Sequence, residues 1–114
     1  MKKEDYTLEV LLDLDGFIAE IGRGYWVKFE AKKIKAPSIN KPYGIKYSLT
    51  LHSPDGDRIL GYDNAHQIQG VDFTKPYDHR HKQARIMQYN YQNAEQLLTD
   101  FWQDVDKFLN KWRH

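Results

Sequence analysis

The chain has no cysteine among its 114 residues, so disulfide bonds and thiolate metal sites are both excluded. Histidine and carboxylate side chains are the strong metal ligands that remain. No apolar run approaches the length of a membrane span, and Glu4 and Asp5 follow the basic start where a secretion signal would have an apolar segment. We therefore expect a cytoplasmic protein with no membrane partner and no cofactor.

An excess of charge of one sign is also absent. The chain has 17 lysines and arginines against 16 aspartates and glutamates, a formal net charge of +1. Any nucleic-acid partner must therefore be met by a local patch. One such patch runs from residue 75 to residue 85, where only one carboxylate, Asp78, opposes four cations: Lys75, Arg80, Lys82 and Arg85.

The composition is that of an ordinary globular protein, with 40% hydrophobic and 29% charged residues. A chain of this length forms one domain around one core. The sequence shows no repeat, no low-complexity tract and no composition shift. We therefore treat residues 1–114 as a single domain.

The first two thirds of the chain predict β-hairpins. Two β-rich runs within residues 8–21 flank Asp15-Gly16, a dipeptide typical of tight hairpin turns. Residues 26–34 alternate apolar and charged side chains, as a strand with one solvated face does. Prolines make residues 36–42 a loop, and residues 45–51 and 58–62 flank a second turn sequence, residues 53–56.

The last third predicts one more strand, residues 86–91, and a long helix. Asn93 and Gln96 form a capping-box pair ahead of that helix. Apolar residues then recur at helical spacing: Leu97, Leu98, Phe101, Trp102, Val105, Phe108, Leu109 and Trp112. The expected fold is α+β, an antiparallel sheet of about five to six strands built from hairpins and packed by one long C-terminal helix.

Chemically capable side chains are concentrated in the middle third. Because His79 and His81 are separated by one residue, an extended backbone places both rings on one face and Arg80 on the other. Two imidazoles can act as general base and general acid in RNA cleavage, one taking the 2′-hydroxyl proton and one protonating the leaving 5′-oxygen. Arg80 or Arg85 would stabilise the charge of the phosphorane.

A second segment, residues 62–66, begins at the last residue of the predicted strand 58–62, so that Asp63 and Asn64 come just past its end and complement this pair. Asp63 is the candidate to orient an imidazole, on His66 or on His81, and to fix its tautomer. We include His66 among the catalytic candidates. The candidate substrate-binding residues come from both segments: Tyr62, Asn64, Tyr77, Asp78, Lys82 and Arg85.

Structural interpretations stand beside these functional ones. Asp63 and Asn64 are also typical of a turn that closes on its own backbone, and Tyr62 and Tyr77 can be core residues or stack on a base. The histidines can be solvated loop residues. A divalent metal bound by histidines and carboxylates is a third interpretation, which no known ligand spacing supports; its ligands would come from His66, His79, His81, Asp63 and Asp78.

A run of lysines precedes the first loop. It is typical of a solvated strand face, and a phosphate-tracking surface is the second interpretation. The residues concerned are Lys28, Lys32, Lys33 and Lys35.

Four segments together resemble a known family. Gly44 to Leu49, Tyr62 to His66, Asp78 to His81 and Leu97 to Trp102 occur in the order seen in the TumE family of small bacterial proteins, toxins of type II toxin–antitoxin pairs. The resemblance covers about residues 44–110, and the first 40 residues match only as a generic hairpin. It implies a growth-inhibiting protein that is neutralised by a helix-turn-helix antitoxin, and by analogy with other small toxins it suggests action on RNA.

Two hypotheses follow. In the first, the protein is a metal-independent ribonuclease-like toxin in which His79 and His81 act as acid and base. In the second, the same basic and aromatic patch grips a nucleic acid or protein without catalysis and regulates by occupancy. An exposed edge of a small sheet would also permit a homodimer by strand pairing.

Overall fold

The computed structural model describes residues 7–35, 44–64, 79–82 and 85–110. Within these ranges the backbone forms two helices and six strands. In chain order they are α1 (Leu8–Asp13), β1 (Ile18–Gly22), β2 (Tyr25–Lys33), β3 (Ile45–His52), β4 (Arg58–Asp63), β5 (His79–Lys82), β6 (Arg85–Gln88) and α2 (Ala94–Asn110).

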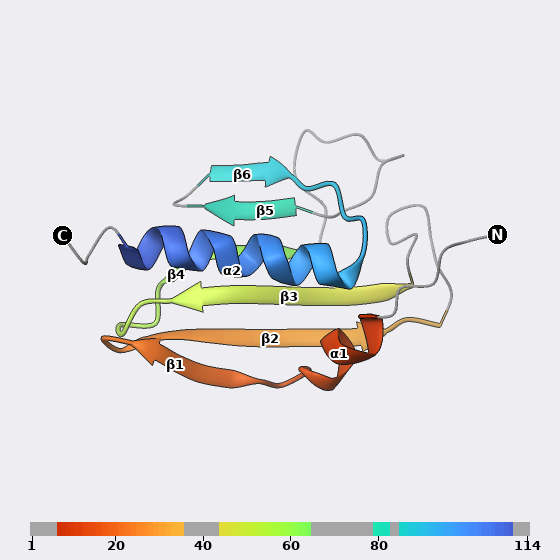
Figure 1. The fold of residues 1–114 in the computed structure, drawn as a ribbon, viewed down its shortest axis with the longest axis horizontal. Coiled ribbons are helices and arrows are strands. Elements are labelled where there is room, and N and C mark those ends of the chain that lie inside the picture. Colours follow the sequence, from red (N-terminus) through yellow and green to blue (C-terminus); the bar gives the residue numbers. More distant parts are fainter. Residues whose placement is uncertain (1–6, 36–43, 65–78, 83–84, 111–114) are drawn as a thin grey trace.

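The strands form one antiparallel sheet in which spatial order equals chain order, β1-β2-β3-β4-β5-β6. Four strands of five to nine residues form its body, and β5 and β6, of four residues each, extend it. The long helix α2 lies across one face of this sheet (Figure 1). The predicted α+β class, with an antiparallel sheet and a C-terminal helix, is confirmed.

The core lies between the sheet and α2. Strands β2 and β3 alternate, so that Val27, Phe29 and Tyr47 are buried while the residues between them are more exposed. Phe101 of α2 inserts against this layer, with its ring centroid 5.3 Å from that of Phe29. We call the α2 side of the sheet the helix face and the opposite side the outer face.

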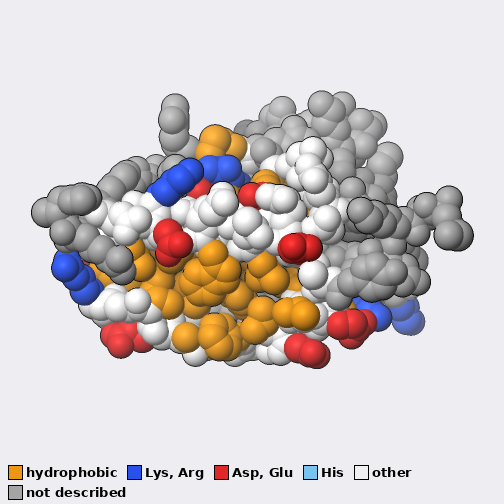
Figure 2. All heavy atoms as spheres, viewed as in Figure 1, with side chains coloured by type: hydrophobic (Ala, Val, Ile, Leu, Met, Phe, Trp, Pro, Cys, Tyr) orange, Lys and Arg blue, Asp and Glu red, His pale blue; other side chains and the backbone are white. Residues whose placement is uncertain are grey.

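Helix α2 forms because its apolar side chains recur every three to four residues on one side. Leu97, Phe101 and Val105 are fully buried, whereas Trp102 and Phe108 pack against the core only in part. Figure 2 shows a continuous hydrophobic area beside α2, between this helix and the β1 edge of the sheet. The central residues of the predicted apolar stripe are therefore part of the core. Trp112 lies outside the described residues.

Of the predicted capping pair, the role of Asn93 as the N-cap is confirmed. The Asn93 carboxamide oxygen accepts a hydrogen bond from the Gln96 backbone nitrogen at 2.7 Å, as an N-cap does. The Gln96 side chain donates along the helix to Asp100 Oδ1 at 2.8 Å.

The prediction of a hairpin pivoting on Asp15-Gly16 was wrong. Residues 8–13 are the short helix α1, and Gly16, with φ of 84°, turns the chain from this helix into β1. Asp15 Oδ1 accepts a hydrogen bond from the backbone nitrogen of Ala31 at 3.0 Å, which ties the turn to β2. A short apolar run fits a helix and a strand equally well, so the sequence could not separate them.

The first hairpin instead joins β1 to β2 through a turn containing Arg23, at φ of 55°. The second predicted hairpin is confirmed, because β3 and β4 pair across residues 53–57. Residues 79–82, for which the sequence predicted no strand, form β5. The predicted proline loop, residues 36–42, lies outside the described residues.

The Asn93 cap generates a stability prediction. Asn93→Ala removes the acceptor for the first-turn amide and should lower the free energy of unfolding by about 1 kcal/mol. Urea denaturation measures this, with Gln92→Ala, just before the cap, as the matched control. Equal stability of the two variants would contradict the capping role.

Candidate functional site

Strand β5 joins the two segments that the sequence singled out. It pairs with β4 so that Asp63 lies opposite His79, Tyr62 opposite Arg80 and Gly61 opposite His81. On its other side β5 pairs with β6. Residues 61–63 and 79–81, whose paired members are at least 16 positions apart in the chain, are therefore direct neighbours in the sheet.

Alternation along these strands divides the candidates between the two faces. Tyr62, 1% exposed, is on the helix face, and Arg80 joins it there. Positions 79 and 81 alternate with position 80 and so belong to the outer face, as do their partners Asp63 and Gly61. The Arg80 side chain is therefore on the side of the sheet opposite to that of positions 79 and 81.

On the helix face, the carboxylate of Asp104 is the centre of a buried polar network. Asp104 is 5% exposed, and its Oδ2 accepts a hydrogen bond of 2.6 Å from the Tyr62 hydroxyl. Arg80 Nε lies 3.3 Å from the same oxygen, and the Arg80 side chain is 31% exposed. The guanidinium carbon also lies 5.6 Å from the centre of the Tyr62 ring, a cation–π distance.

Asp100, one turn earlier in α2, extends this network. Its Oδ2 accepts a hydrogen bond of 2.6 Å from the hydroxyl of Tyr89, which follows β6. The Tyr62 and Tyr89 rings meet edge to face, with centroids 4.8 Å apart. The network thus connects β4, β5 and the segment after β6 to a single helix.

Both tyrosine hydroxyls are held in the protonated form. Burial, followed by the hydrogen bond to Asp104, raises the pKa of Tyr62 far above its ordinary value. Burial and the hydrogen bond to Asp100 raise the pKa of Tyr89 in the same way. These groups are donors to carboxylates and are poorly suited to act as bases.

Asn64 continues the pairing of β3 and β4 by one step. Its Oδ1 accepts a hydrogen bond from the Tyr47 backbone nitrogen at 2.9 Å, and its Nδ2 donates to the Ile45 oxygen at 2.8 Å. The side chain is buried, and both ends of its carboxamide are engaged. Binding a substrate through Asn64 would require these bonds to break.

Asp63 ends β4 on the outer face and is 3% exposed. In the sheet it lies between Ser48 of β3 and His79 of β5. The backbone of β5 and β6 is described, whereas the side chains of His79, His81, Lys82 and Arg85 are not. His66, Tyr77 and Asp78 lie outside the described residues, so their predicted roles stay predictions.

The family model described as Toxin TumE matches residues 13–109. This chain belongs to the TumE toxin family. The match begins well before residue 44, so the prediction that the resemblance covers only about residues 44–110 was wrong. Strands β1 and β2 also belong to the family domain. No match was found among the curated proteins or among the solved structures.

Three residues of the network in this TumE-family chain were not among the sequence candidates: Tyr89, Asp100 and Asp104. The signal for Asp104 was its position, since it falls between Phe101 and Val105 on the apolar stripe of α2. A carboxylate at a core position of a helix needs a donor from the facing layer.

Within the described ranges, no three histidine, aspartate or glutamate side chains lie together as a metal site would require. Neither α1 nor α2 is long and apolar enough to cross a membrane.

The pair of Asp104 and Arg80 can be tested by a double-mutant cycle. Asp104→Ala leaves the Tyr62 hydroxyl and Arg80 Nε without their carboxylate and should cost about 3 kcal/mol in the free energy of unfolding. Arg80→Met should cost less, because this side chain is partly exposed. Urea denaturation of both single variants and the double variant should give a coupling energy of about 1 kcal/mol or more. Additive effects would show that the 3.3 Å contact contributes nothing.

The raised tyrosine pKa values predict instability at high pH. A raised pKa in the folded state contributes stability that is complete below the unfolded pKa, about 10, and that is lost as pH rises toward the folded pKa. Above pH 10, Tyr62 should steepen the decline of the free energy of unfolding by about 1.4 kcal/mol per pH unit. Tyr62→Phe should therefore decline less steeply than the wild type in urea denaturation between pH 9 and 11.5. Parallel declines would contradict the assignment.

Proposed function

We propose that this protein is an RNA-cleaving toxin whose acid and base groups, His79 and His81, act on the outer face of the sheet. The observation that carries the proposal is the register of β4 and β5. It brings Asp63, at the end of β4, directly opposite His79, and it puts positions 79 and 81 on one face of β5.

The register supports acid–base chemistry for a geometric reason. Residues directly opposite in an antiparallel pair have Cβ atoms about 4.5–5.5 Å apart, which allows a carboxylate to hydrogen-bond an imidazole. Such a carboxylate fixes the imidazole tautomer and raises its basicity. Because the register favours His79 as the partner of Asp63, we assign the oriented base to His79 and the acid to His81.

Arg80 has a different role in this proposal from the one the sequence suggested. Its Nε faces Asp104 on the helix face, away from the positions of the histidines. We assign Arg80 to positioning: it fixes β5 against β4 and α2, and through that register it aligns His79 with Asp63. A cation on the outer face must then stabilise the phosphate.

Membership of the TumE toxin family supports the toxin role and suggests a cognate antitoxin. In the proposal, the antitoxin has a helix-turn-helix domain and is encoded beside the toxin. The alternative is a non-catalytic module that binds nucleic acid or protein through the same face.

Growth and RNA analysis test the proposal. Induced expression of the wild type should arrest growth and produce cleaved RNA, and His79→Ala/His81→Ala should abolish both at an equal soluble level. His52→Gln, at the far end of β3, is the matched histidine control and should keep the wild-type effect. Arrest by the double variant equal to that of the wild type would contradict catalysis by these residues.

Kinetics separates the enzyme from the binding module. With purified protein and an RNA substrate, His81→Ala should lower the rate of an enzyme about 10²–10⁴-fold. A binder should produce no cleavage at all, and the same substitution should weaken its complex by about 1–3 kcal/mol.

A further inference from the structure

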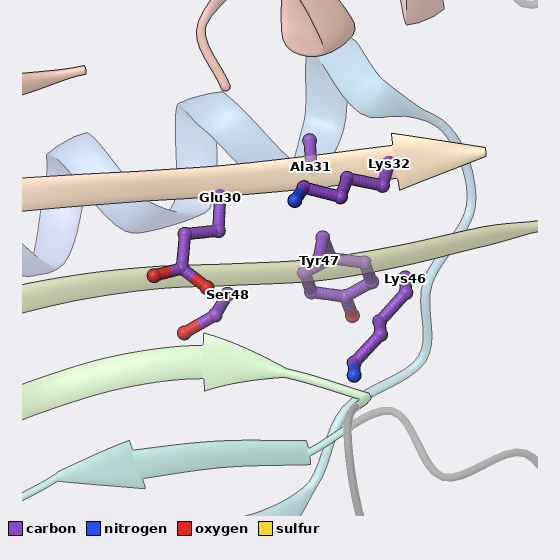
Figure 3. Close-up of a pocket in the computed structure, with 6 residues that line it drawn as sticks. All are labelled: Glu30, Ala31, Lys32, Lys46, Tyr47 and Ser48. Carbon is purple, nitrogen blue, oxygen red and sulfur yellow. The ribbon is translucent and has the colours of Figure 1, made fainter. Parts of the chain in front are cut away.

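The outer face has a hollow of about 130 Å³ where β2 and β3 pair. Two residues whose side chains belong to the core, Ala31 and Tyr47, form part of its wall. The other four, shown in Figure 3, alternate with buried positions and so belong to the outer face: Glu30, Lys32, Lys46 and Ser48.

Two lysines, one from each strand, line this hollow. Lys32 and Lys46 are direct Cα partners in the β2–β3 register, and both are exposed (Figure 3). Like charges placed directly opposite in a sheet repel and destabilise the pairing. Among the described residues, no carboxylate forms an ion pair with either lysine.

Two neighbouring lysines of β2, in contrast, lie close to carboxylates. Lys33, one residue along β2, approaches Glu9 of α1 at 3.9 Å. Lys28 lies 3.1 Å from Glu30, so the nearest carboxylate to the hollow is already offset by a cation. Within the described ranges Lys32 and Lys46 thus form no ion pair, and they line a hollow that also has the Ser48 hydroxyl.

Two ammonium groups and a hydroxyl around a hollow are the chemistry of phosphate binding. Lysine contributes a point charge with several donors, and serine hydroxyls commonly bond phosphate oxygens of nucleic acids. A bound phosphate would also remove the repulsion between the lysines. The negative charge of Glu30, which also lines the hollow, should weaken phosphate binding. A substitution that removes this charge should therefore strengthen the binding.

We propose that Lys32, Lys46 and Ser48 bind a backbone phosphate of single-stranded RNA. The placement fits the proposed function, on which the identity of this ligand rests. Ser48 pairs with Asp63, and Asp63 pairs with His79, so the hollow lies about two strand spacings, roughly 10 Å, from His79 on the same face. The site would hold a phosphate that flanks the scissile one, and it supplies the outer-face cations that Arg80 does not.

The test measures binding separately from cleavage. The probe is a fluorescein-labelled single-stranded 12-mer of mixed sequence with 2′-O-methyl riboses, which lacks the 2′-hydroxyl nucleophile. Fluorescence anisotropy between 50 and 300 mM NaCl gives the affinity and its salt dependence. The variants are Lys32→Ala/Lys46→Ala, Glu30→Gln and a control with the same charge change, Lys33→Ala/Lys107→Ala.

Loss of the lysine pair should weaken binding about tenfold and lower the slope of log K against log salt by roughly 0.7 to 1.4. The control should bind nearly as the wild type does, and Glu30→Gln should bind about threefold more tightly. Equal weakening by the two double variants, or no weakening by Lys32→Ala/Lys46→Ala, would overturn the proposal, as would failure of the wild type to bind the probe.

His79→Ala/His81→Ala separates this inference from the nuclease proposal. Adding Lys32→Ala/Lys46→Ala to that variant should still weaken its binding of the uncleavable probe about tenfold if the lysine site is correct. Specific loss of binding by the lysine variant in a protein that cleaves no RNA would support the phosphate site and reject the nuclease. RNA cleavage by a protein whose binding does not depend on Lys32 and Lys46 would support the nuclease and reject the phosphate site.

Discussion

The arrangement of β4, β5 and α2 depends on the contacts that the buried carboxylate of Asp104 makes with Tyr62 and Arg80. Burying an ionised carboxylate is costly unless hydrogen bonds or cations compensate it. Here Tyr62 of β4 donates a hydrogen bond to Asp104, and Arg80 of β5 lies within ion-pair distance of the same oxygen. Because those residues are also direct partners across β4 and β5, the same contacts favour one register of the two strands. A shift by one residue would turn Arg80 to the outer face and leave Asp104 without its cation.

This register has consequences on the other side of the sheet. Once Tyr62 is opposite Arg80 in this antiparallel pair, Asp63 is opposite His79. Both of these positions belong to the outer face, since successive residues of a strand alternate between faces. The helix face therefore uses its charged groups to hold the layers together, while the outer face carries the groups to which we assign chemistry. Effects of Arg80 substitutions on activity would, on this view, be transmitted through strand register.

Sequence patterns predicted the elements whose signals are local. The stripe of α2 and the turn at residues 53–56 each specify their structure within a few residues. Helix α1 was mistaken for a strand because six residues are too few to distinguish the two periods. Strand β5 was missed because it is short and polar, and Asp104 because its partners are distant in sequence. The proximity of Asp63 to His79 follows from strand pairing, which no local pattern encodes.

The division into two faces also explains how a chain with a net charge of only +1 can present a site for a polyanion. Asp100 and Asp104 carry negative charge, but both are hydrogen-bonded on the helix face and are separated from the outer face by the sheet. Screening by salt limits exposed charges to a range of about 8–10 Å, so local charges at the hollow matter more there than the total. Lys32 and Lys46 repel each other in the absence of an anion. A phosphate between them turns that cost into attraction, and this gives the outer face a preference for a ligand that carries repeated negative charge.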